Sequence, residues 1–308
     1  MSARVVKKVK LSDLGEFGLI DLLKKQIKGP FSGIRGIGDD AAVVPLSSKK
    51  YLLLTTDMLL EGVHFTLKMP ARGIGHKAIA SSISDIAAMG GIPKYAVVSL
   101  GAPSSCPWPV VSQIYQGMQR TAKKFHVGIV GGDTVKAKKI IINVCLVGEV
   151  KKDEVVYRSG ARAGDQIFVT GPLGRSLSSG GHLRFAPRIA ESQHLVKRHK
   201  PTAMIDISDG LVADLGHILS ESRVGAMIEE SSIPKRQKAH LKEALYDGED
   251  FELLFTLPPL KARKLEGRNK SKHRFYRIGE IVPRDKGLRL KTSDSRLKKL
   301  RVKGYTHF

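Results

Sequence analysis

The stretch Gly36-Ile37-Gly38-Asp39-Asp40-Ala41-Ala42 places two adjacent carboxylates in a glycine-rich turn, directly before an apolar run that reaches Val44. Such a pair indicates an ion site, because two carboxylates about 4 Å apart repel by roughly 4 kcal/mol at an effective dielectric constant near 20. Mg²⁺ is a hard cation that prefers oxygen ligands, and substrate phosphates often complete its coordination. The residues after the turn predict a short strand that ends at Pro45.

Further aspartates stand at the ends of other apolar runs, beside glycine or hydroxyl side chains. They are Asp57, Asp85, Asp133, Asp206 and Asp209. A single aspartate in such a place usually serves a turn or a cap. Asp85, however, is expected near a helix C-terminus, where its charge opposes the helix dipole unless a cation compensates. We therefore expect these acids to converge on one metal site.

The composition is that of a globular protein with an unusual charge. The chain has 308 residues, of which 42% are hydrophobic, and this length predicts two domains. The net charge is +23, and residues 261–308 alone contribute +13. A net positive charge of this size suggests that nucleic acid could be a partner. No arginine-rich arm, RNP-like motif or zinc-finger spacing accompanies it, so a solvated basic surface is favoured and nucleic acid is not expected.

Cysteine usage and hydropathy predict a location in the cytoplasm. Cys106 and Cys145 are far apart and form no CxxC motif, which fits a reducing compartment. Residues 1–10 are basic but lack the apolar region of a signal peptide. No apolar run approaches the ~20 residues that a membrane span needs.

Hydrophobic periodicity predicts an α/β fold of the α+β type with mixed sheets flanked by helices. Helices are expected over 15–28, 75–88, 109–125 and from 211 onward, with at most one helix in 175–201. Strands are expected over 41–44, 51–56, 95–100, 127–130, 140–150, 166–170, 204–207, 251–256 and 275–282. The charged run at 151–154 suggests a boundary between an N-terminal domain, 1–152, and a C-terminal domain, 153–308. Helices are predicted on one face of each sheet.

Two common phosphate-binding motifs do not account for the site. Gly36-x-Gly38-x-x-Ala41 formally matches a dinucleotide fingerprint, but a strand rather than a helix follows it, and its two acids would face a pyrophosphate. The sequence GxxxxGK[ST] is absent, which excludes a P-loop.

The motifs together resemble the thiamine-monophosphate kinase family, in the superfamily of aminoimidazole ribonucleotide synthetase and selenophosphate synthetase. The resemblance spans nearly the whole chain. It rests on Gly15-Glu16-Phe17-Gly18, Gly36-Ile37-Gly38-Asp39-Asp40, Thr55-Thr56-Asp57, Glu61-Gly62-Val63-His64-Phe65, Ser84-Asp85-Ile86-Ala87, Gly131-Gly132-Asp133-Thr134, Arg158-Ser159-Gly160, Asp206-Ile207-Ser208-Asp209-Gly210, Gly248-Glu249-Asp250 and Gly304-Tyr305-Thr306-His307-Phe308.

This resemblance implies ATP-dependent phosphorylation of thiamine monophosphate to thiamine diphosphate by direct transfer, in a homodimer that pairs through the N-terminal sheets. It implies that several Mg²⁺ ions are held by Asp40, Thr55, Thr56, Asp57, Asp85, Asp133, Asp206 and Asp209. Catalytic roles fall to Asp57, Asp133 and Asp209. ATP would contact Gly132, Asp133, Arg158 and Ser208, and the thiamine moiety would contact His64, Glu249 and Tyr305.

Two departures and two rival functions remain. The segment between Gly174 and Asp206 is shorter than the family pattern and lacks an obvious helix, and Asp247 stands where a second glycine is common. One rival is a sister enzyme with another substrate, although the first cysteine, Cys106, lies too late for a selenophosphate synthetase. The other is a nucleic-acid-binding protein on an inactive kinase scaffold.

Overall fold

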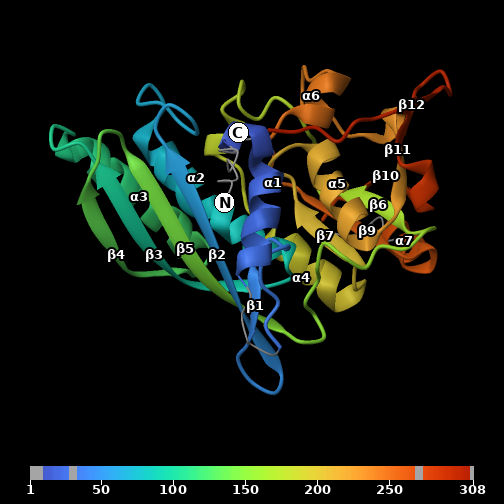
Figure 1. Cartoon of the computed structure of the whole chain (residues 1–308), viewed down its shortest axis with the longest axis horizontal. Helices are drawn as coiled ribbons and strands as arrows, with labels where there is room; N and C mark the ends of the chain where they lie inside the picture. Colours follow the sequence, from blue (N-terminus) through green and yellow to red (C-terminus); the bar gives the residue numbers. More distant parts are fainter. Residues whose placement is uncertain (1–9, 28–32, 268–272, 306–308) are drawn as a thin grey trace, which may run out of the picture.

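A computed structural model describes residues 10–27, 33–267 and 273–305, which form two mixed β-sheets with helices packed against them (Figure 1). The expected end of the first helix at Gly29-Pro30 and the last three residues of the tail lie outside the described residues. None of the helices in the described ranges is long and apolar enough to cross a membrane.

The N-terminal sheet has five strands in the order β1-β2-β5-β3-β4, with only β3 and β4 parallel. The strands are β1 (Ala42–Pro45), β2 (Lys50–Leu60), β3 (Ile92–Ala102), β4 (Gly128–Lys136) and β5 (Ile141–Lys151). Helices α2 (Ala71–Ala88) and α3 (Trp108–Lys124) cover one face. The opposite face is exposed, and its apolar side chains include Leu54, Met58, Tyr95 and Val97.

Glycines allow α2 and α3 to cross closely. A Cβ at Gly75 of α2 would lie 1.8 Å from the carbonyl oxygen of Ile114 in α3, and a Cβ at Gly117 would lie 2.0 Å from that of Arg72. Small residues along the rest of α2 let the helix be buried on almost every side. The helix is therefore the central element of the molecule and touches both sheets.

The C-terminal sheet has seven strands in the order β12-β11-β8-β10-β6-β9-β7. The strands are β6 (Gln166–Val169), β7 (Ala203–Asp206), β8 (Gly225–Glu229), β9 (Leu253–Leu257), β10 (Tyr276–Val282), β11 (Leu288–Lys291) and β12 (Leu297–Lys299). One face packs on α5 (Leu211–Ser222) and α6 (Leu241–Tyr246), and the other on α4 (Ile189–Arg198), α7 (Pro259–Glu266) and the end of α2. Helices on a single face were thus the wrong expectation for this domain.

Several local predictions need correction. Asp57 lies inside the long strand β2 rather than at its end, and the strand expected over 127–130 continues through Gly131–Thr134 as part of β4. The segment between Gly174 and Asp206 contains α4 and a short 3-10 helix, η1 (Gly181–Leu183). The sequence reading also missed β8, β11, β12, α6 and α7, which are short.

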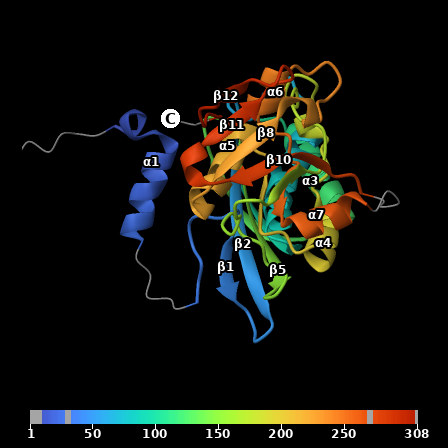
Figure 2. The ribbon, with the colours of Figure 1, turned by 90° about the vertical axis from the view of Figure 1, so that its right-hand side faces the viewer.

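Helix α1 (Leu11–Gln26) lies at one side of the molecule, outside both sheets (Figure 2). None of its residues is buried, and Gly15, with φ of 65°, kinks it. Its ring contact is between Phe17 and His217 of α5, whose centroids are 4.9 Å apart.

Candidate active site

Three carboxylates from distant parts of the chain meet where the two sheets adjoin. Asp40 precedes β1, Asp85 lies in the last turn of α2, and Asp206 ends β7. One carboxylate oxygen of each lies within 4.8 Å of those of the other two. We call these three residues the acid cluster, and it draws on both domains.

The acid cluster has the properties of a cation site. Burial raises the pKa of Asp206 to about 8, with the charge of Asp40 as the next cause. Burial and the charges of Asp57, Asp206 and Asp40 raise the pKa of Asp85 well above its usual range. One oxygen of Asp40, Oδ2, is buried and has no hydrogen-bond partner among the described residues. An all-oxygen donor set with an unsatisfied, buried acceptor fits Mg²⁺.

Hydroxyl groups orient these acids. Thr55 Oγ1 donates to Asp85 Oδ2 over 2.5 Å, and Ser84 Oγ donates to Asp206 Oδ2 over 2.6 Å. Ser82 Oγ donates to Asp57 Oδ2 over 2.8 Å. Asp57, whose pKa is raised by burial, adjoins the acid cluster because its charge acts on Asp85. Thr55 and Asp57 therefore lie on the helix-covered face of β2, and their role in binding metal stays a prediction.

Two arginines hold the glycine-rich turn. Arg35 Nε lies 2.6 Å from Asp39 Oδ2, and the backbone N–H of Arg158 donates to Asp39 Oδ1 over 2.7 Å. Arg158 Nη2 donates to Asp40 Oδ1 over 2.9 Å, and this carboxylate raises the pKa of the guanidinium against the effect of burial. Asp39 is therefore held by neighbouring groups, while Asp40 keeps one oxygen for a cation. Arg158 lies in the site, at the edge of the acid cluster.

A cavity of about 600 Å³ opens beside Asp57 and reaches the predicted substrate residues. Its wall includes His64, Ser208, Asp209, Glu249 and Tyr305. The C-terminal tail reaches it because Gly304 packs against α5, where a Cβ would lie 2.4 Å from that of Ala213, and because the Tyr305 N–H donates to the Asp209 carbonyl. Residues far apart in sequence thus form one wall, beside the acid cluster.

Lys77 of α2 is a site residue that the sequence analysis missed. Its side chain is 1% exposed, and its ammonium donates to Glu249 Oε1 over 2.6 Å and to the His64 carbonyl over 2.9 Å. Burial lowers the pKa of Lys77, and Glu249 counteracts this. The signal was a lone lysine between buried apolar residues of a helix. Lys77 lines the cavity and joins the two domains through its ion pair with Glu249.

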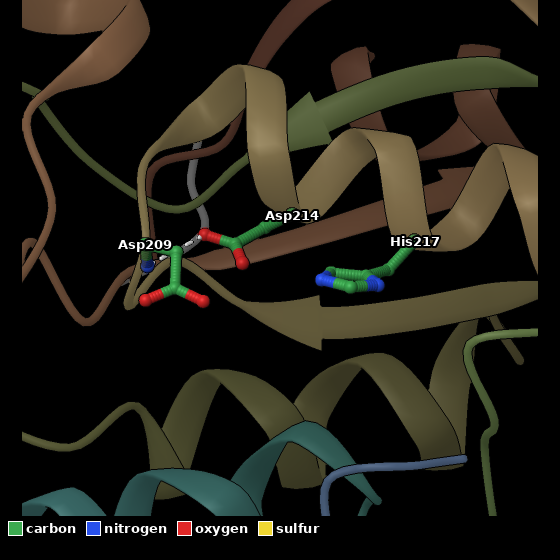
Figure 3. Close-up of side chains that lie close together, drawn as sticks. All are labelled: Asp209, Asp214 and His217. Carbon is green, nitrogen blue, oxygen red and sulfur yellow. Dashed lines mark hydrogen bonds between the residues drawn. The ribbon is translucent and has the colours of Figure 1, made fainter. Parts of the chain in front are cut away.

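Asp214 and His217 on α5 were also missed, and they lie beside Asp209 (Figure 3). Asp214 Oδ2 accepts from the backbone N–H groups of Asp209 and Gly210, both over 3.1 Å. Burial raises the pKa of Asp214 well above its usual range and, together with Arg158, lowers the pKa of His217 to about 4. The carboxyl of Asp214 therefore fixes the loop that carries Asp209.

Thr56, Gly132 and Asp133 do not lie with the acid cluster. Thr56 Oγ1 donates to Asn143 Oδ1 on the exposed face of the sheet, opposite to Thr55. Asp133 pairs with Ser99 on that same exposed face. Three strand steps separate β2 from β4, which at roughly 4.8 Å per strand is about 14 Å. In a single chain these side chains therefore point away from Asp57.

Strand packing by itself explains the glycine at 132. A Cβ there would lie 1.9 Å from the carbonyl oxygen of Val98 in β3. The predicted approach of a phosphate to this glycine stays a prediction.

Comparison with known proteins agrees with this architecture. The family models described as AIR synthase related protein, N-terminal domain, and AIR synthase related protein, C-terminal domain, match residues 38–150 and 175–291. The thiamine-monophosphate kinase of Aquifex aeolicus is 40% identical over 279 residues, which cover 81% of this chain and 88% of that protein. The enzyme of Bacillus subtilis is 34% identical over 325 residues, covering 96% and 100%.

A solved structure supports the same relationship. The structure of AaThiL complexed with AMPPCP and TMP is 36% identical to this chain, covers 98% of it and all of that chain, and gives a TM-score of 0.85. Two family models that together match more than two thirds of the residues, and relatives of this identity over nearly full length, leave one assignment. The chain belongs to the thiamine-monophosphate kinase family.

Proposed function

We propose that this protein transfers the terminal phosphoryl group of ATP to thiamine monophosphate, giving thiamine diphosphate and ADP. One observation carries the proposal: the acid cluster adjoins a cavity whose wall holds the paired side chains of Lys77 and Glu249. The relatives named thiamine-monophosphate kinase support the choice of substrates.

Phosphoryl transfer requires little covalent chemistry from the protein. An oxygen of the acceptor phosphate, already ionised near neutral pH, attacks the terminal phosphorus, and the bond from that phosphorus to the bridging oxygen of ADP breaks. No general base is needed. Bound Mg²⁺ supplies charge neutralisation and in-line alignment of the phosphates. The acid cluster, with Asp57 and Asp209, would hold these ions.

We propose roles for Arg158, Ser208, His64, Glu249 and Tyr305 from their positions. Arg158 can exchange its contact with Asp40 for a nucleotide phosphate, since a guanidinium binds either anion. Ser208 lines the cavity two residues after Asp206 in the chain, where it would contact ATP. His64, Glu249 and Tyr305 line the cavity, where they would bind and orient the thiamine moiety.

We further propose that the working unit is a homodimer that pairs through the exposed face of the N-terminal sheet. This face carries Leu54, Met58, Tyr95 and Val97, an apolar surface that water would otherwise cover. Asp133 lies on it, so Asp133 would serve the site of the partner copy. We therefore expect mixtures of Asp133→Asn and Asp85→Asn proteins, refolded together, to regain activity that neither has alone. A mixture as inactive as its parts would remove Asp133 from a shared site.

The direct test is turnover. Purified protein with Mg²⁺, ATP and thiamine monophosphate should yield thiamine diphosphate and ADP in equal amounts, measured by chromatography, and thiamine or another monophosphate should react far more slowly. Turnover of a different acceptor would favour a sister enzyme. No turnover with any acceptor, together with salt-sensitive binding of RNA or DNA, would favour the nucleic-acid-binding alternative.

A further inference from the structure

We propose that a second cavity, between α2, α3 and the 179–185 segment, binds a phosphate- or diphosphate-bearing small molecule. The cavity has a volume of about 730 Å³. None of its lining residues lines the cavity beside Asp57. Its walls come from both domains, as those of the active site do. We call it the basic cavity.

The charge of the basic cavity has one sign. Arg72 on α2, Arg120 and Lys124 on α3, and Arg184 after η1 all line it, and no carboxylate does. Among the described residues none of these four cations makes an ion pair. Like charges around one hollow repel each other, and a bound anion relieves that repulsion as a cation relieves it in the acid cluster.

Neutral partners hold two of these cations in place. The guanidinium of Arg72 donates twice to Gln116 Oε1, over 3.1 and 2.9 Å, and Arg184 Nη2 donates to the Ser179 carbonyl over 2.8 Å. All four cations are exposed, and what distinguishes them from the general surplus of positive charge is that they line one cavity that no carboxylate lines. A guanidinium held by neutral acceptors keeps its full charge for an anion.

The positive charges of the cavity also act on a half-buried neighbour. His76 lines it and is held between Thr121 Oγ1, at 2.8 Å, and the carbonyl oxygen of Phe185, at 2.7 Å. Burial lowers the pKa of His76, and the charges of Lys124 and Arg120 lower it further. The imidazole therefore stays neutral and serves as part of the wall.

The size and the rest of the wall indicate an organic phosphate rather than a bare ion. The volume falls within the roughly 300–1,000 Å³ usual for small-molecule sites. Pro70, Leu183 and Phe185 supply apolar wall. The cations can bind the phosphate end while these side chains cover an apolar ring or chain.

The test measures binding in the absence of divalent metal, so that it does not depend on the proposed kinase activity. With EDTA present, the acid cluster repels polyanions, and the variants described below show whether the binding that remains is at the basic cavity. Calorimetric titration of the full chain should give saturable, one-to-one binding of inorganic pyrophosphate and at least threefold tighter binding of ADP. Equal affinity for the two probes would overturn the organic part of the proposal.

A matched pair of variants separates the site from bulk charge. Arg120→Ser with Lys124→Ser should weaken pyrophosphate binding at least tenfold. The control, Lys298→Ser with Lys299→Ser on the exposed strand β12, removes the same charge and should change the affinity less than twofold. Equal losses in both double variants, or no saturable binding by the unaltered protein up to about 10 mM, would overturn the proposal.

Two further measurements keep the result interpretable. Melting curves should show that all variants fold, and if the α3 double variant does not, Arg184→Ser tests the opposite wall. Turnover with Mg²⁺, ATP and thiamine monophosphate should stay within twofold in both double variants. Loss of binding with retained turnover supports the basic cavity, whereas absent turnover in the unaltered protein bears only on the proposed function.

Discussion

At the scale of single residues, α2 carries buried charged groups of opposite sign about two turns apart. Asp85 and its neighbours repel one another at the last turn, while Lys77, two turns earlier, is neutralised by Glu249. Removing a charge should therefore have opposite consequences at the two places. Removing the charge of Asp85 should stabilise the folded protein, because it reduces repulsion between carboxylates. Removing the charge of Lys77 should destabilise it, because Glu249 is left without a partner.

Asp85→Asn should lower turnover by about 10²-fold or more, because an amide binds Mg²⁺ far less well than a carboxylate. The same change should leave the melting temperature in EDTA unchanged or higher, since it removes repulsion within the acid cluster. Steady-state kinetics and differential scanning fluorimetry measure both effects. Asp153→Asn, between the domains, is the matched control and should alter neither. Near-normal activity of Asp85→Asn would remove this residue from the metal site.

Lys77→Met should reduce the free energy of unfolding by about 3 kcal/mol, because it leaves Glu249 without its partner. We also expect the KM for thiamine monophosphate to rise more than kcat falls, since Lys77 positions wall residues and does not contact the acid cluster. Urea unfolding and kinetics test the two statements. Adding Glu249→Gln should restore most of the stability. If it restores none, the ion pair is not what Lys77 contributes.

At the scale of elements, sequence periodicity predicted most of the long helices and strands, while the roles that the motifs imply for the site residues stay predictions. Asp40, Asp57, Asp85 and Asp206 converge as expected. The prediction that Asp57 ends a strand was wrong, because Met58, Leu59 and Leu60 continue β2 beyond the polar residues. The strand predicted to end at residue 130 continues through the glycines of β4, and Gly132 permits close contact with β3. Lys77 could not be predicted because its partner is 172 residues away.

The crossing of α2 and α3 gives a prediction at this scale. Gly75→Ala should destabilise the protein by about 1–3 kcal/mol, because the new methyl group would overlap the carbonyl of Ile114. Alanine normally favours a helix, so the effect runs against propensity. The control is Gly18→Ala in α1, because the new methyl group there would make only an ordinary van der Waals contact with Leu14. It should be neutral or stabilising by urea unfolding. Equal behaviour of the two variants would mean that the helices can separate freely.

At the scale of the whole molecule, stability should depend on pH and on metal together. Asp206 has an ordinary pKa of 3.8, and the folded protein without metal raises it to about 8. Between these values the folded state keeps a proton that the unfolded state has released. The free energy of unfolding therefore falls as pH rises through this range.

We accordingly expect a lower melting temperature in EDTA at about pH 8 than at about pH 6, and a larger increase on adding Mg²⁺ at the higher pH. Differential scanning fluorimetry measures both. Asp206→Asn should flatten the dependence on pH and reduce the effect of Mg²⁺. A metal-free protein that became more stable with rising pH over this range would contradict the electrostatic account of the acid cluster.

The contact between Lys77 in the first half and Glu249 in the second has one more consequence. Dividing the chain near residue 152 would yield two fragments. One would carry Lys77 and the other Glu249, and each of these charged groups would lack the partner that it has in the whole chain. Each fragment alone would expose this interior surface to water and should aggregate. Co-expression of the two fragments should yield both as soluble protein. Exchange of one domain for that of a distant homologue would also leave one of these two charged groups without its partner.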